Sequence, residues 1–195
     1  MARPTTFDRD EVVARAMNLF WRKGYRATST RDLVEHLGIN QSSFYNTFDG
    51  GKRGLYLEAL DRYRRAGLVA LRRQLREKDS PLASIRYAFE EVAEEAIDRR
   101  DGCFMTNATV EEAPHDAATN KRAKESLAAM REAFAEATRR AQAAGEVGEE
   151  RDARALGYYL TNAYNGIRVT AKADPEEAVV RGIVEETLRG LRCTG

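Results

Sequence analysis

The stretch from Thr28 to Phe48, TSTRDLVEHLGINQSSFYNTF, constrains the fold of this chain more than any other segment. Ser29 followed by Asp32 forms a capping-box pattern, which marks the start of a helix. Gly38 is typical of a helix end, because glycine adopts the left-handed conformation there without steric cost. Asn40 is a favourable N-cap for a following helix. The stretch therefore predicts two short helices joined by a tight turn.

The second of these helices is polar where it begins and apolar where it is anchored. Gln41, Ser42 and Ser43 lie at its start, whereas Phe44 and Phe48 supply the apolar anchors. Glutamine can bond adenine with both amide atoms, and serine can donate or accept at any base edge, so the helix suits insertion into a major groove. Two helices and a turn in about twenty residues match a helix-turn-helix unit. Spacing alone leaves a plain helical corner as an equal alternative.

Residues 8–24, DRDEVVARAMNLFWRKG, predict a third helix that closes a small domain around this unit. Asp8, with Glu11 three residues later, marks its start, and Gly24 marks its end. The residues expected to face inward are Val12, Ala16, Leu19 and Phe20.

Together with this helix, the unit resembles the tetracycline-repressor-like (TetR/AcrR) transcription regulators. The resemblance covers residues 7–63, and the remainder is similar only in helical character and length. It implies an all-α fold, with an N-terminal three-helix helix-turn-helix domain (residues 1–52) and a larger helical-bundle domain for ligand binding and dimerisation (residues 53–195). The matching residues are Leu19-Phe20, Gly24-Tyr25, Thr28-Ser29, Gly38, Phe44-Tyr45, Phe48 and Lys52.

Double-stranded DNA is the expected partner of the first domain. Thr28, Thr30 and the amides that begin their helix suit a phosphate group. The resemblance implies that Tyr45 contacts a phosphate through its hydroxyl group and that Lys52 is the phosphate-contacting lysine of the family, although the preceding loop, DGG, is one residue longer than usual. The residues expected to contact DNA are Thr28, Thr30, Gln41, Ser42, Ser43, Tyr45, Asn46 and Lys52.

The distribution of charge agrees with DNA binding in the first part of the chain. Residues 1–65 carry 12 Lys and Arg against 8 Asp and Glu, whereas residues 66–195 carry 20 against 23. The positive excess thus lies where phosphate contacts are expected. No apolar run approaches the length of about eighteen residues that spans a membrane, and residues 1–10 lack the apolar core of a signal peptide. We therefore expect a cytoplasmic protein without membrane association, with Cys103 and Cys193 reduced.

The rest of the chain predicts six further helices and shows no strand pattern. The first runs from Arg53 to about residue 78 and is very basic on its outer face, which we interpret as a solvated surface. The others are expected to begin at Ser80-Pro81, at Cys103 with Gly102 as N-cap, at Asp116 or Thr119, at Glu150, and at Asp174-Pro175 with Glu177 completing a capping box.

The helix expected from residue 150 to 172 carries apolar or small residues on two faces, and the second face predicts a partner. A second copy of the chain would form a four-helix bundle about a two-fold axis. Two DNA-binding domains about 34–36 Å apart can then read a palindrome. One face consists of Leu156, Leu160, Ala163 and Ile167, and the other of Gly157, Tyr158, Thr161, Asn165 and Arg168.

A pocket for a small-molecule effector is expected among the helices between residues 81 and 172. Most of its candidate residues are expected to be ordinary core, since Met and Phe at helical spacing usually are. The candidates other than Cys103 are Phe89, Phe104, Met105, Asn107, Met130, Phe134, Tyr159 and Asn162.

Cys103 is a further candidate because helix-terminal amides favour a thiolate in the first turn of a helix. A Gly-Cys pair at this place resembles a subset of TetR-like regulators that sense electrophiles or oxidants. The alternative is a small buried apolar residue.

Catalysis is not expected. Glu112 and His115 have the spacing of a di-iron ligand pair, but Pro114 breaks the helix between them and the chain has only two histidines. We expect no metal and no cofactor. The sequence predicts a ligand-responsive repressor that binds a palindromic operator as a homodimer and is released by a small apolar or thiol-reactive effector. An activator, or a ligand-binding helical module without DNA binding, are the alternatives.

Overall fold

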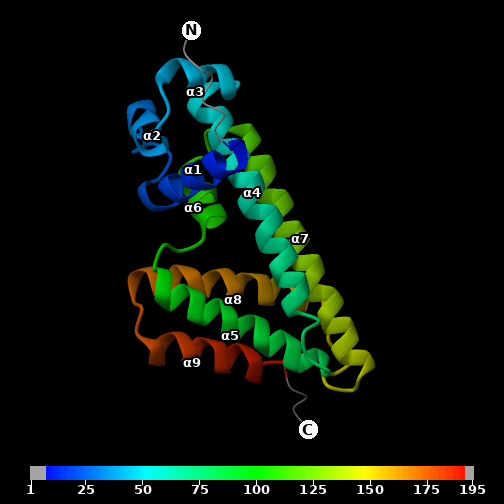
Figure 1. Cartoon of the computed structure of the whole chain (residues 1–195). Coiled ribbons are helices and arrows are strands. Elements are labelled where there is room, and N and C mark those ends of the chain that lie inside the picture. Colours follow the sequence, from blue (N-terminus) through cyan, green and yellow to red (C-terminus); the bar gives the residue numbers. More distant parts are fainter. Residues whose placement is uncertain (1–7, 192–195) are drawn as a thin grey trace.

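The computed structural model describes residues 8–191, which form nine α-helices and no strands (Figure 1). Cys193 lies outside these residues. The predicted all-α fold is confirmed. The helices are α1 (Arg9–Lys23), α2 (Thr30–Leu37), α3 (Gln41–Thr47), α4 (Gly51–Gln74), α5 (Pro81–Arg99), α6 (Phe104–Glu111), α7 (Ala117–Ala143), α8 (Ala153–Ala173) and α9 (Glu177–Arg189).

The helices form two groups that are joined by two long helices. We call α1, α2 and α3, residues 9–47, the head. Figure 1 shows the head at one end of the molecule and a layer of α5, α8 and α9 at the other. Helices α4 and α7 run side by side and connect the two ends. The helix α6 lies beside the head, although it comes after α5 in the sequence.

The local signals of the helix-turn-helix unit are confirmed in detail. Ser29 Oγ accepts from the Asp32 amide at 3.1 Å, and Asp32 Oδ2 accepts from the Ser29 amide at 2.7 Å. Gly38 has a φ of 68° and ends α2 in the left-handed conformation. The Asn40 side chain accepts from the Ser43 amide at 2.8 Å and caps α3. Short-range hydrogen bonds therefore fix the angle at which α3 leaves α2.

Two apolar cores stabilise the molecule. The first contains Phe20, Phe44 and Tyr56 from the head and α4, and Phe104 of α6 is buried among them. The second is built by α5, α7, α8 and α9, with the end of α4, around Phe89. Because α4 contributes to both cores and begins at Gly51, it spans the boundary that we place between residues 52 and 53. The division into two domains stays a prediction.

Several expected helix starts are wrong by a few residues. Helix α4 begins at Gly51 rather than Arg53 and ends at Gln74 rather than near residue 78. Helix α8 begins after Asp152, whose short side chain accepts from the Arg154 amide at 2.9 Å. The expected capping box at Glu177 is also wrong, because the Asp174 side chain accepts from the Glu176 amide before α9 begins.

Four of the five residues on the second face of α8 contact other helices of the same chain, which the sequence analysis did not predict. Gly157 packs closely on α7, where an added Cβ would lie 2.6 Å from the Arg131 carbonyl oxygen. Asn165 and Arg168, about two and three turns further along α8, line a pocket between α4, α6, α7 and α8. Most of this face therefore packs within one chain, whereas Tyr158 is 44% exposed.

Candidate DNA-binding surface and effector pocket

The start of α3 presents polar side chains at the surface of the head. Gln41, Ser42 and Asn46 are exposed, and Ser43 is half-buried. Phe44 and Phe48 are fully buried and hold the opposite side of the short helix against the first core. The exposed amide and hydroxyl groups are of the kinds that hydrogen-bond to base edges.

The residues expected at phosphate groups differ in how accessible they are. Thr30 is half-buried at the first position of α2. Thr28 is a correction to the expected set, because its side chain is fully buried and its hydroxyl donates to the Gly24 carbonyl oxygen at 2.6 Å. The Thr28 side chain therefore stabilises the loop before α2 and is not available to DNA.

Tyr45 on α3 packs against the start of α4, where Lys52 lies one residue after Gly51. The Tyr45 side chain is 52% exposed, and a Cβ on Gly51 would lie 3.0 Å from its ring. The Lys52 ammonium lies 4.1 Å from the centroid of the Tyr25 ring. Partial burial lowers the pKa of Lys52.

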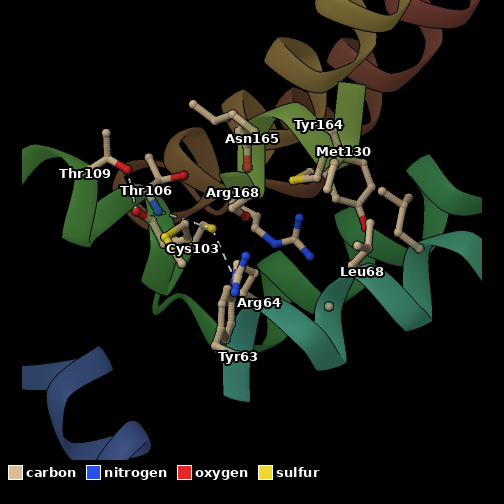
Figure 2. Close-up of a pocket in the computed structure, with 16 residues that line it drawn as sticks. Tyr63, Arg64, Leu68, Cys103, Thr106, Thr109, Met130, Tyr164, Asn165 and Arg168 are labelled. Carbon is tan, nitrogen blue, oxygen red and sulfur yellow. Dashed lines mark hydrogen bonds between the residues drawn. The ribbon is translucent and has the colours of Figure 1, made fainter. Parts of the chain in front are cut away.

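A pocket of about 60 Å³ lies between α4, α6, α7 and α8 (Figure 2). Its apolar wall includes Leu68, Leu71, Met105 and Met130. Polar side chains complete the wall. They are Tyr63, Arg64, Cys103, Thr106, Thr109, Ser126, Tyr164, Asn165 and Arg168.

Two arginine side chains project into this pocket. Arg168 Nη2 donates to Glu95 Oε2 at 3.1 Å, and its guanidinium lies 4.6 Å from the centroid of the Tyr164 ring. Burial opposes the charge on Arg168, but the electrostatic effect of Tyr164 and its other neighbours raises the pKa of Arg168 overall. The group is therefore a permanent cation inside the protein.

Cys103 is the N-cap of α6, which corrects the expectation that Gly102 caps this helix. Its extended backbone (φ −106°, ψ 121°) lets the sulfur accept from the Thr106 amide at 3.4 Å. The Tyr63 hydroxyl also donates to this sulfur at 3.4 Å. Burial raises the pKa of Tyr63 well above 10, so Tyr63 is a neutral donor. The Cys103 side chain is itself buried and faces the pocket.

The far end of α6 contacts the head. Glu111 accepts from the amides of Tyr25 and Arg26, at 3.0 and 2.8 Å. Glu112 Oε1 pairs with Arg26 Nε at 2.6 Å. Just before α6, the Asp101 carbonyl oxygen accepts from the Trp21 indole at 3.1 Å. One helix of eight residues therefore lines the pocket at its start and holds the loop between α1 and α2 at its end.

Comparison with known proteins agrees with this architecture. The family model described as "Bacterial regulatory proteins, tetR family" matches residues 12–59, and "Tetracyclin repressor-like, C-terminal domain" matches residues 81–185. The chain belongs to the TetR family. This family is one of DNA-binding transcriptional regulators. None of the helices between residues 8 and 191 has the length and apolar character to cross a membrane.

Two curated relatives match the TetR-family chain along most of its length. It is 33% identical over 194 residues to the uncharacterized HTH-type transcriptional regulator YezE of Bacillus subtilis (strain 168), which covers 98% of this chain and 100% of that protein. It is 30% identical to the HTH-type transcriptional repressor ComR of Escherichia coli (strain K12), over 96% of this chain and 90% of that protein.

A solved structure with the same fold is that of the TetR family transcriptional regulator CifR. A cysteine mutant of CifR was solved in complex with 26-bp double-strand operator DNA. Its TM-score with the present chain is 0.85 at 28% identity, with 96% of this chain and 98% of that chain covered.

Three of the nine expected effector-binding residues, Cys103, Met105 and Met130, line the pocket of the TetR-family chain. Phe89 and Phe134 are instead buried against Tyr164 in the second core. Tyr159 and Asn162 are exposed on α8. The other two expected residues lie between α6 and its neighbours, where Phe104 packs on Trp21, Tyr56 and Tyr63, and Asn107 donates to the Asp101 carbonyl oxygen at 3.2 Å.

Sequence reasoning missed the two pocket arginines. The sequence places Arg168 and Asn165 on the second face of α8, but it predicts that this face contacts a partner chain and not a pocket. Arg64 stands beside Arg62 and Arg65 in the basic run DRYRR, and such a run is typical of a solvated helix surface. The helical spacing from Arg64 to Leu68 and Leu71 was the signal that placed it beside apolar residues.

Proposed function

We propose that this TetR-family chain is a transcriptional repressor that binds a palindromic operator as a homodimer and is released by a small apolar or thiol-reactive effector. The observation that carries the proposal is the polar start of α3, where Gln41 and Ser42 are exposed and Phe44 is fully buried. The printed description of ComR as a repressor, and of CifR with operator DNA, supports it.

A homodimer is supported by the outer face of α8 and α9. Tyr158 is 44% exposed and Val169 51% exposed on α8, and Val179 on α9 is exposed as well. Gly166 and Gly182 lie on the same two helices, with nothing within 4 Å of an added Cβ. Apolar groups and small residues on one face suit close packing against a second copy. The dimer face that we propose therefore shares Tyr158 with the face that the sequence predicted, and otherwise consists of a third face of α8.

The pocket and α6 provide a route from effector to DNA. An effector that binds beside Cys103, Thr106 or Thr109 contacts the start of α6, and the end of α6 holds the loop between α1 and α2 through Glu111. A ligand releases DNA only if it binds better to a conformation whose heads no longer match the groove spacing. A shift of α6 would change the position of the head in this way.

Cys103 is the residue through which a thiol-reactive effector would act. Its sulfur lines the pocket and accepts two hydrogen bonds, from the Thr106 amide and the Tyr63 hydroxyl. A covalent group on this sulfur would occupy the space of the pocket and disturb both hydrogen bonds. The N-cap of α6 would then be lost, at a typical cost of about 1 kcal/mol.

A gel shift with DNA from upstream of the chain's own coding region tests the proposal. We expect binding to this DNA at a lower protein concentration than to a scrambled fragment of the same length. Gln41→Ala should weaken binding to the upstream DNA and leave binding to the scrambled fragment unchanged, because a base contact carries sequence preference. Equal loss on both fragments would remove Gln41 from base reading.

A further inference from the structure

The lining of the effector pocket is uneven in charge. Sixteen residues form it, and Arg64 and Arg168 are the charged residues among them. The carboxylates that pair with these arginines, such as Glu95 and Glu125, lie outside the lining. Figure 2 shows the two guanidinium groups in the middle of the pocket, one from α4 and one from α8. The lining of the pocket thus contains two guanidinium groups and no carboxylate.

The guanidinium of Arg168 has more donors than its partner uses. The side chain is 13% exposed, whereas Glu95 is 44% exposed and partly solvated. A guanidinium carries five N–H groups in a planar fork, and the interaction with Glu95 uses Nη2. An Arg fork matches a carboxylate with two parallel hydrogen bonds. Arg168 is already buried in the protein, so a bound anion can accept hydrogen bonds from its remaining N–H groups.

Arg64 has an unsatisfied donor. Its two terminal nitrogens donate to Glu125 at 2.8 Å and to Asp61 at 3.0 Å. Its Nε is buried and has no hydrogen-bond partner among residues 8–191. A buried N–H group without an acceptor is unfavourable, and such groups in native proteins often mark a missing water, ion or ligand. An acceptor atom that enters the pocket beside Arg64 would satisfy it.

The apolar side of the pocket and its volume determine which group can be attached to the anion. Leu68, Leu71 and Met130 offer an apolar surface next to the arginines. The cavity volume is about 60 Å³. A protein cavity of about 150 Å³ admits benzene, so this smaller pocket limits the ligand to a short apolar tail.

We propose that the effector of this pocket is a small carboxylate anion with a short apolar tail, bound by Arg168 and Arg64. The inference rests on the proposed function, because it concerns the effector of the same repressor, and it replaces a wholly apolar effector with an anion whose tail alone is apolar. The carboxylate lies between the two guanidinium groups, and the tail lies against Leu68, Leu71 and Met130.

Isothermal titration of the full chain, without DNA, tests the charge requirement with butanoate and butanamide. The two probes have the same carbon skeleton and differ in charge. A hydrogen bond to a charged group is stronger than one between neutral groups, so butanoate should bind at least about tenfold more tightly. Equal affinities, or tighter binding of butanamide, would overturn the proposal.

Variants of the arginine and of its partner test the assignment of Arg168. Arg168→Gln should weaken butanoate binding by about tenfold to a hundredfold and leave butanamide binding nearly unchanged. Glu95→Gln keeps the cation and removes the competing carboxylate, so it should strengthen butanoate binding severalfold. A merely structural role for the Glu95 pair predicts no gain in affinity. The matched control is Arg139→Gln, since Arg139 pairs with Glu132 on the exposed side of α7. An unchanged affinity for butanoate in both Arg168→Gln and Glu95→Gln would overturn the assignment.

Operator binding, measured separately, distinguishes this inference from the proposed function. If butanoate binds as described but does not lower operator affinity, the proposed release mechanism fails while the carboxylate site stands. If the chain binds its operator but neither butanoate nor longer carboxylates bind the free protein, the repressor proposal stands and the carboxylate site is overturned.

Discussion

The carboxylate of Glu111 on α6 holds the backbone of Tyr25, whose amide donates to Glu111 Oε2 at 3.0 Å. The amide of Arg26 donates to the other carboxylate oxygen at 2.8 Å. Gly24 comes directly before them, with a φ of 87° and only 3.2 Å between an added Cβ and the same carboxylate. One side chain of α6 thus fixes three successive residues of the loop that leads into the helix-turn-helix unit.

Glu111→Ala is expected to destabilise the chain and loosen the head. Loss of a charged acceptor for two amides should lower the free energy of unfolding by about 1.5–3 kcal/mol, as measured by urea denaturation. Glu132→Ala is the matched control, because Glu132 forms an exposed ion pair with Arg139 that is worth about 0–1 kcal/mol. Equal effects of the two substitutions would contradict a special role for Glu111.

Lys52→Ala is expected to weaken binding to every DNA sequence by a similar factor. If Lys52 neutralises one phosphate, the slope of log affinity against log salt concentration should fall in magnitude by about one. Lys124→Ala, an exposed lysine of α7, should leave the slope unchanged. An unchanged slope in Lys52→Ala would show that the ammonium stays on the Tyr25 ring and does not reach DNA.

The helix-turn-helix unit could be predicted from the sequence because its capping interactions join residues that are close in the chain. Ser29 with Asp32, Gly38, and Asn40 with Ser43 all act within four residues, so their hydrogen bonds follow from residue type and spacing. The polar face of α3 was predictable for the same reason. A helix that alternates small polar residues with buried aromatics presents the former to solvent.

The pocket was less predictable because its residues come from four helices. Arg64 and Arg168 are more than one hundred positions apart and meet only through the packing of α4 and α8. On α8 alone, Asn162 is exposed whereas Asn165 lines the pocket, a difference of three residues that sequence cannot assign without knowing the neighbouring helices. Phe89 and Phe134 are candidate effector-binding residues because they are aromatic, but in the structure they pack against each other in the second core.

A sensing role for Cys103 predicts rapid alkylation. In a Cys193→Ser background, iodoacetamide should label Cys103 faster than a model thiol, and the labelled protein should lose affinity for its operator. The Thr106 amide and the Tyr63 hydroxyl both donate to this sulfur, so Tyr63→Phe, which removes one donor, should slow the labelling. Labelling no faster than that of the model thiol would exclude the sensor and leave an effector that binds without a covalent bond.

Gly166→Arg is expected to convert the dimer to a monomer. Nothing lies within 4 Å of an added Cβ at Gly166 in the single chain, so the variant should fold and keep its helical circular dichroism. A large charged side chain on a close-packed dimer face would block association, which sedimentation velocity measures. Ala66→Arg, at an exposed position of α4, is the control. A Gly166→Arg protein that sediments as a dimer would contradict the proposed face.

Hydroxyl-radical footprinting on the DNA upstream of the coding region tests the central claim most directly, because it reports both α3 and its symmetry-related copy. We predict two protected half-sites of opposite orientation, with centres a whole number of helical turns apart, about 10–10.5 bp for each turn. A single protected half-site, or no protection at a protein concentration that saturates binding, would contradict a dimer that reads DNA through two exposed α3 helices.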